Sequence, residues 1–157
     1  MQYRMKNYQL TKEQADNLLL KSQDCVLATQ GKDGFPYAIP MNFVYHNDKI
    51  YMHGLEKGEK IDNIKANSKV CVEIHEMLGL LYENIDVGCD VNVKYNSVVI
   101  FGYASILTNT DVKREILNLV VKKYTPQFSG KDLPENMVKN TGVIEVEIKE
   151  YTGKYYK

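Results

Sequence analysis

The segment from His53 to Lys60, with the sequence HGLEKGEK, carries residues that could bind an anion. Gly54 and Gly58 permit a tight backbone turn. Lys57 and Lys60 lie three residues apart at the start of a predicted helix, where free backbone N–H groups favour negative charge. The segment is therefore a candidate phosphate cradle, although it matches neither the Walker pattern nor G-x-G-x-x-G. The alternative is a solvated charged turn in which the neighbouring glutamates offset the lysines.

His53 is the histidine best placed for catalysis, because it ends a predicted strand beside this cradle and an imidazole can transfer protons near neutral pH. The alternative for a lone histidine at a strand end is a structural role. The histidines show no spacing typical of zinc ligands, so no metal site is predicted. No Ser-His-Asp arrangement or G-x-S-x-G motif is present, so acyl transfer is not expected.

Length and charge limit the classes of protein to which the chain can belong. Its 157 residues include 20 Lys plus Arg and 20 Asp plus Glu, and 44% are hydrophobic, which fits one domain over residues 1–157. Zero net charge without a basic arm argues against nucleic acid as a partner. No apolar run is long enough to span a bilayer, so no membrane partner is expected. The three cysteines form no C-x-x-C pair, which suits a reducing, cytoplasmic location.

The first half of the chain predicts a helix followed by strands. Thr11 opens T-K-E-Q, a capping-box pattern ahead of an apolar stripe, so we expect an amphipathic helix at 11–22. The period then becomes that of strands, and short turns separate three of them, at 25–29, 37–45 and 50–53. Strands joined in this way should form an antiparallel meander.

The second half predicts two more helices, at 58–66 and 111–124, and three more strands, at 70–74, 97–107 and 143–148. Gly102 indicates a bulge or a close backbone approach within its strand. Residues 75–96 show no clear period, so we expect a long excursion with at most a short extra strand. Its acidic part, residues 73–90, would select or cover a ligand, or form a solvated loop. Six strands in near-sequential antiparallel order with flanking helices predict an α+β, mainly β fold built on a small barrel.

Five motifs in order carry a resemblance that covers nearly the whole chain, from residue 11 to residue 151. They are CVLAT, DGFPYAIPMNFVY, KIYMHG, KGEKIDNIKANSKVCVEI and YNSVVIFGYA. Together they resemble the pyridoxamine 5′-phosphate oxidase-related flavoproteins, and within these the nitroimidazole-resistance, or nitroimidazole reductase-like, branch. The resemblance implies an FMN-binding split β-barrel that works as a homodimer with flavin at the interface. It also favours the phosphate cradle over the charged turn.

The resemblance implies four groups of flavin contacts. They are the strand that borders the isoalloxazine ring (Ile39, Pro40, Met41 and Asn42), the strand end beneath the flavin (His53 and Gly54), the phosphate-binding turn (Lys57, Gly58 and Lys60), and a strand from the other subunit (Ser97 and Val98). In the nitroimidazole-resistance branch, the histidine that corresponds to His53 lies near the flavin, which makes His53 the expected catalytic residue.

The chain also departs from the oxidase itself. The oxidase carries an arginine where this chain has Ile39 and another where it has Glu59, and its C-terminal Trp and Arg motif is absent from TGKYYK. These groups would hold a pyridoxal phosphate substrate and the flavin phosphate. Oxidation of vitamin B6 is therefore not expected, and the affinity for FMN should be modest.

The expected function is that of an FMN-dependent oxidoreductase, a nitroreductase-like enzyme in which the flavin carries the redox chemistry and the protein binds and orients. Electrons would come from NADH or NADPH and pass to a small acceptor such as a nitroimidazole or another nitroaromatic, while His53 hydrogen-bonds or protonates near the flavin. One alternative is a non-catalytic module of the same fold that binds flavin or haem. Another is a relative that has lost the cofactor and only dimerises.

Overall fold

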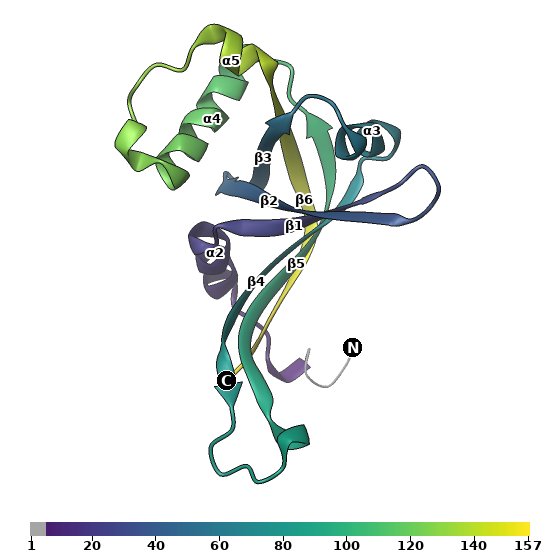
Figure 1. Cartoon of the computed structure of the whole chain (residues 1–157), viewed down its shortest axis with the longest axis vertical. Helices are drawn as coiled ribbons and strands as arrows, with labels where there is room; N and C mark the ends of the chain where they lie inside the picture. Colours follow the sequence, from purple (N-terminus) through teal and green to yellow (C-terminus); the bar gives the residue numbers. More distant parts are fainter. Residues whose placement is uncertain (1–5) are drawn as a thin grey trace.

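The computed structural model describes residues 6–157 and consists of a ring of six antiparallel strands with helices around it (Figure 1). The order around the ring is β1-β2-β3-β6-β5-β4, and β4 closes it by pairing with β1. The strands are β1 (Asp24–Gln30), β2 (Pro36–His46), β3 (Lys49–Leu55), β4 (Lys69–Leu81), β5 (Asn92–Ile106) and β6 (Thr141–Tyr156). The predicted α+β, mainly β barrel is therefore confirmed.

Neighbouring strands are mostly consecutive in the sequence, as predicted. β1, β2 and β3 form the expected meander, and β4, β5 and β6 form a second one. Two further pairings, of β3 with β6 and of β4 with β1, join the two meanders into the ring.

In the described part of the chain, the helices outside the ring include α2 (Lys12–Lys21), α3 (Glu59–Ala66), α4 (Thr110–Tyr124) and α5 (Glu135–Asn140), with short 3-10 turns at Gly88–Asp90 and Pro126–Phe128. The predicted capping box is present, because the Thr11 hydroxyl accepts from the Gln14 N–H and the Gln14 side chain accepts from the Thr11 N–H. The sequence does not predict α5, whose six residues bury only Val138 and are too few to show a period. Within residues 6–157, no helix is both long and apolar enough to cross a membrane.

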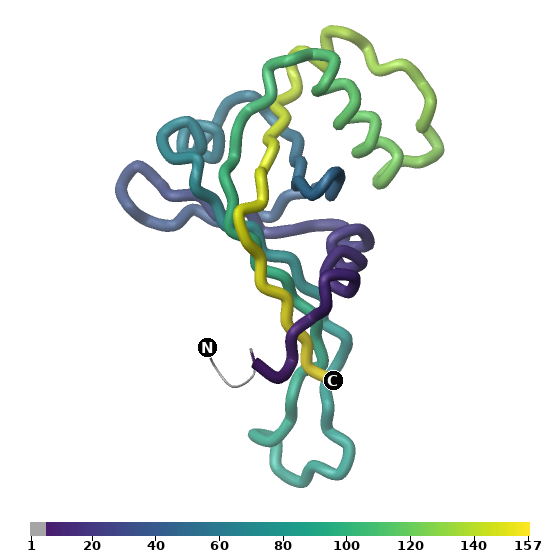
Figure 2. The backbone as a smooth tube through the Cα atoms, turned by 180° about the vertical axis from the view of Figure 1, so that it is seen from behind, coloured from purple at the N-terminus to yellow at the C-terminus, as the bar shows by residue number. Residues whose placement is uncertain are grey.

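The prediction of an irregular excursion at 75–96 is wrong for most of that segment. β4 continues to Leu81 and β5 begins at Asn92, so only residues 82–91 lie outside strands. From His75 onward both faces of β4 are largely exposed, which removes the alternation of apolar and polar residues that identifies a strand. β6 likewise extends to Tyr156, past its predicted end at 148. We call residues 75–97 and 149–156 the arm, which projects away from the barrel in Figures 1 and 2.

The side chains of β3 alternate between two apolar clusters. Ile50 and Met52 point into the barrel, where the core also contains Leu27, Phe43, Val72, Ile100 and Val146. Tyr51 points outward into a second cluster with Val44, Ile116, Leu117, Val120, Val138 and Val143, which α4 and α5 cover. Because successive side chains of a strand alternate between its faces, the outer face of β3 lies beneath α4 and α5.

Gly102 lies at a β-bulge, where the register between β5 and β6 shifts after Phe101. A Cβ atom at Gly102 would collide with the Glu147 carbonyl oxygen and lie 2.8 Å from Val146 Cγ1. The predicted bulge and close backbone approach are therefore confirmed.

We expect Gly102→Ala to lower the free energy of unfolding by about 2 kcal/mol or more, because β5 and β6 must move apart to admit the methyl group. The measurement is urea unfolding followed by circular dichroism. Gly88→Ala is the matched control, since Gly88 is exposed and a Cβ atom there meets nothing within 4 Å. Equal stability of Gly102→Ala and the unaltered protein would contradict the close approach.

Candidate functional site

β2 and β3 part halfway along β2. Residues 43–46 of β2 pair with residues 49–52 of β3, and the register between the two strands ends at Phe43 and Met52. Beyond that point, residues 36–42 of β2 pair with β1, whereas residues 53–55 of β3 pair with β6. Figure 1 shows β2 and β3 running in different directions from this point. We call the opening between residues 39–42 and residues 53–55 the split.

Residues 39–42 of β2 form one side of the split, with a backbone edge toward the opening and side chains on both faces of the strand. Ile39 and Met41 are partly buried and pack against the barrel core, while Pro40 and Asn42 are exposed. The Asn42 side-chain amide donates to the Gln23 carbonyl oxygen at 3.0 Å, which ties the residue to the chain just before β1. The four residues predicted to border a flavin ring therefore form one wall of the split.

The β3 side of the split carries His53. By strand alternation its side chain lies on the same outer face as Tyr51. Its Nδ1 atom is buried and has no hydrogen-bond partner among the described residues. Burial also lowers the pKa of His53 from its usual value, so the imidazole is neutral at pH 7. Leaving a buried polar atom unpaired costs about 1–3 kcal/mol, which points to a partner from outside the chain.

The β3 side continues into the start of α3, where the predicted phosphate turn comes together. Gly58 is the N-cap of α3, with a φ of 122° that favours glycine, and no side chain caps the helix. Its first backbone N–H groups therefore remain free for an anion. Lys60 folds back over the end of β3, since its Nζ lies 3.6 Å from the position that a Cβ atom would take at Gly54. Lys57 is exposed beside this turn.

A buried lysine that the sequence analysis missed holds this turn in place. The Lys113 side chain, on α4, is only 4% exposed, and its ammonium donates to Glu56 Oε1 at 3.1 Å and to the Lys139 carbonyl oxygen at 2.8 Å. Glu56, in the loop between β3 and α3, is thereby fixed to α4. A signal was available in the sequence, because Lys113 falls on the same stripe of α4 as Ile116, Leu117 and Val120.

Tyr124, near the end of α4, fixes the point where β2 leaves β3. Its hydroxyl accepts from the Phe43 N–H at 2.9 Å and lies 2.6 Å from the Gln23 carbonyl oxygen, to which it can donate. One phenol therefore satisfies backbone groups of both β2 and the segment before β1. This contact involves residues 81 positions apart and had no signal in the sequence.

The other two predicted flavin contacts, Ser97 and Val98, lie far from His53 within one chain. Ser97 is opposite Lys154 on β6, whereas His53 is opposite Val143, and these β6 residues are about 35 Å apart along a strand that rises about 3.3 Å per residue. Ser97 is nearly buried, and the Val98 side chain packs in the barrel core. The structure therefore does not bring Ser97 and Val98 to the split of their own chain.

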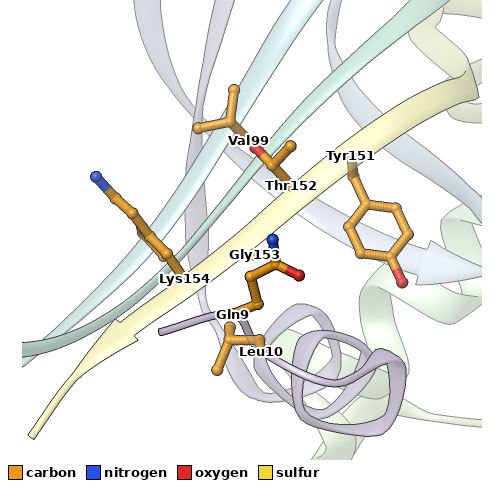
Figure 3. A pocket seen from close by; sticks show the side chains of 8 residues that line it. Gln9, Leu10, Val99, Tyr151, Thr152, Gly153 and Lys154 are labelled. Carbon is orange, nitrogen blue, oxygen red and sulfur yellow. The ribbon is translucent and has the colours of Figure 1, made fainter. Parts of the chain in front are cut away.

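A cavity of about 400 Å³ lies instead on the arm, around Ser97 (Figure 3). Gln9, Leu10, Val99, Tyr151, Thr152, Gly153 and Lys154 complete its lining. Figure 3 shows side chains from β6 and from the segment before α2 around Gly153, whose missing side chain leaves room for Leu10. The residues of the split make no contribution to this cavity.

Metal ligation has no support in the described part of the chain. Among residues 6–157, no three His, Cys, Asp or Glu side chains gather closely enough to hold a metal ion. The three cysteines are free, with Cys25 buried, Cys71 half-buried and Cys89 exposed.

Comparison with solved structures shows where this architecture recurs. The chain is 27% identical to a protein from Bacteroides thetaiotaomicron provisionally named a 5-nitroimidazole antibiotic resistance protein, with a TM-score of 0.79 over 92% of this chain and 84% of that chain. The flavocytochrome Anf3 from Azotobacter vinelandii is 18% identical, with a TM-score of 0.85 over 100% of this chain and 72% of that chain. An FAD and heme binding protein from Mycobacterium smegmatis is 18% identical, with a TM-score of 0.82 over 94% and 72%.

The sequence itself was compared with curated proteins and with family models. No curated protein matches the chain. A family model described as pyridoxamine 5′-phosphate oxidase matches residues 11–155, which include the whole ring of strands, the split and the turn before α3. This chain therefore belongs to the pyridoxamine 5′-phosphate oxidase family.

Proposed function

We propose that the chain binds FMN at the split and acts as an oxidoreductase that passes electrons to a small acceptor such as a nitroaromatic compound. The observation that carries the proposal is the approach of Lys60 to Gly54 at the uncapped start of α3, one residue along β3 from His53, whose Nδ1 has no partner among the described residues. A flavin phosphate needs positive charge and backbone donors, and its ring needs a polar partner against an apolar wall. The end of β3 and the start of α3 supply the charge, the backbone donors and the polar partner, and the β2 side of the split supplies the apolar wall.

The charge balance of the turn favours a phosphate over a self-neutralised loop. Of the two glutamates in this turn, Glu56 pairs with Lys113 through Oε1, and Glu59 forms no ion pair among the described residues. Within residues 6–157, neither Lys57 nor Lys60 takes part in an ion pair. At 4 Å a unit charge attracts another by about 4 kcal/mol at an intermediate dielectric constant, before the cost of desolvation. Two such lysines beside free N–H groups suit a dianionic phosphate.

The ring of the flavin would lie along β2. Ile39 and Met41 supply apolar contacts, and the backbone edge of β2 that faces the split supplies donors and acceptors for ring heteroatoms. His53, as a neutral imidazole, could donate a hydrogen bond from one ring nitrogen and accept one at the other. When bound, FMN would supply the chemistry that moves two electrons from NADH or NADPH to the acceptor. A nitro group takes two electrons and two protons to become a nitroso group and water.

A second copy of the chain would complete this site. Ser97 cannot reach the split of its own chain, but the arm projects far enough from the barrel to meet another copy (Figure 2). The family resemblance, in which Ser97 and Val98 correspond to the strand from the other subunit, supports a homodimer with flavin at the interface.

A binding module without turnover is the second candidate. The names of two similar structures, the flavocytochrome and the FAD and heme binding protein, describe flavin together with haem. A chain of this kind would hold flavin or haem and show no steady consumption of NADH or NADPH. The visible spectrum before and after addition of NADH or NADPH separates the two functions, because a bound flavin that bleaches supports the enzyme.

We expect Lys57→Ala and Lys60→Ala each to weaken FMN binding about tenfold, because each removes one charge from the phosphate. Fluorescence titration of the purified protein measures the dissociation constant. Riboflavin lacks the phosphate, so its weaker binding should be unchanged in both variants, and Lys65→Ala, at the exposed end of α3, is the control variant. Equal loss of riboflavin and FMN binding would contradict a phosphate cradle.

We expect His53→Ala to lower kcat for nitroaromatic reduction by tenfold or more while the dissociation constant of FMN changes less than about threefold. His53→Gln keeps a hydrogen-bonding group without an imidazole and should retain part of the rate. Stopped-flow and steady-state absorbance with NADH or NADPH measure both steps. A rate that is unchanged in His53→Ala would remove His53 from the catalytic role, and an unaltered protein that binds FMN without turnover would favour the binding module.

Mixed dimers test whether the site combines the split of one copy with the arm of the other. The two parents are Lys57→Ala/Lys60→Ala, altered at the split, and Ser97→Leu, altered on the arm. In a purified mixed dimer one site carries both lesions and the other carries neither, so one FMN should bind per dimer with the affinity of the unaltered protein. Circular dichroism first establishes that both parents fold. Mixed dimers that bind no better than their parents would refute the shared site.

A further inference from the structure

A cavity outside the split lies between α2, α4 and the C-terminal end of β2, and has a volume of about 280 Å³. Figure 1 shows the end of β2 between these two helices. Its walls are partly apolar, with Leu20 from α2, Val44 from β2 and Leu119 from α4. The remaining lining is polar and consists of Tyr45, His46, Lys122 and Lys123. None of the residues of the split or of the turn before α3 lines this cavity, so it is independent of the proposed flavin site.

Lys123 is the unusual group in this cavity, because its side chain is half-buried and no carboxylate among the described residues forms an ion pair with its ammonium. Its Nζ donates to the Phe43 carbonyl oxygen at 2.9 Å and lies 4.1 Å from the centre of the fully buried Phe43 ring. Burial lowers the pKa of Lys123 to about 8. A carbonyl oxygen and an aromatic face offset only part of the cost of desolvating a charge.

Two acidic side chains of this region, Asp16 and Asp48, are engaged elsewhere, and Asp24, which lies near Cys25, forms no ion pair with Lys123. Asp16 accepts from Lys12, and both Asp16 and Asp48 interact with the Tyr45 hydroxyl. Among residues 6–157, no carboxylate forms an ion pair with Lys123 or Lys122. Cys25 is the other group that affects the pKa of Lys123. Its thiol stays neutral at pH 7, because burial raises the pKa of Cys25 to about 12. The chain therefore supplies no anion to this lysine.

We propose that this cavity binds a small monocarboxylate with an apolar body, whose carboxylate meets Lys123 while its body lies against Leu20, Val44 and Leu119. The half-buried Lys123 ammonium matches one anionic group, and Lys122 adds a second positive charge to the lining. The volume suits a body about the size of one aromatic ring.

Benzoate is the probe that tests the site, and its binding is followed by two-dimensional NMR of the ¹⁵N-labelled full chain. We expect saturable binding with a millimolar or lower dissociation constant and shift changes centred on the amides of Leu20, Val44 and Leu119. Benzyl alcohol has the same body without the charge and should bind at least tenfold more weakly. Lys123→Met should weaken benzoate binding at least tenfold, whereas Lys32→Met, in the exposed turn between β1 and β2, should leave it unchanged.

Three results would overturn the proposal. They are the absence of saturable binding at millimolar benzoate, shift changes centred on Lys57–Lys60 instead of the cavity, and equal binding of benzoate and benzyl alcohol by the unaltered protein. Melting temperatures of the variants separate lost binding from lost folding. If Lys123→Met does not fold, the comparison of benzoate with benzyl alcohol and the positions of the shifted amides still decide the question on the unaltered protein.

Discussion

The structure depends on the transfer of β2 from one partner strand to another. A buried backbone must pair its N–H and C=O groups, and β2 does so with β1 along its first seven residues and with β3 along its last four. At the point of transfer, Phe43 lies beyond the start of β1, and the Tyr124 hydroxyl takes the place of the missing strand. This single phenol pairs the Phe43 N–H beyond the start of β1, while the edge of β2 that faces the split stays open. The opening between the strands, the position of His53 and the approach to α3 all follow from that transfer.

The ion pair between the buried Lys113 and the exposed Glu56 is the second interaction that shapes the site. Taking a lysine out of water costs several kcal/mol, and here one carboxylate oxygen and one carbonyl oxygen accept hydrogen bonds from its ammonium. The pair connects α4 to the loop after β3 across 57 residues of sequence. The pair affects the charge of the loop after β3 as well as its position. With Glu56 held by α4, one of the two glutamates beside Lys57 and Lys60 is paired with another lysine.

Local signals in the sequence predicted the parts of the fold that they encode. The capping box located α2, alternating residues located the first meander, and the closeness of Gly58, Lys57 and Lys60 in sequence brought the turn before α3 together. Contacts across the fold could not be predicted in this way. Nothing in the sequence indicates that the Tyr124 hydroxyl bonds to the backbone of Phe43. The distance between Ser97 and the split depends on how the ring of strands closes. The sequence did not predict the strands of the arm, because both of their faces meet solvent. Their residues therefore do not alternate between apolar and polar.

The arm also differs from the barrel in how its order is maintained. Barrel strands have a partner on each side and an apolar core beneath them, whereas the end of the arm leaves Met77, Leu80 and Tyr82 exposed. Few buried contacts mean a low free energy of local opening, so amide hydrogens in the arm should exchange with solvent well before those of the barrel. Any partner that orders the arm must offset the conformational entropy that these residues retain in the isolated chain. Association through the arm will therefore be weaker for its area than association through the rigid barrel.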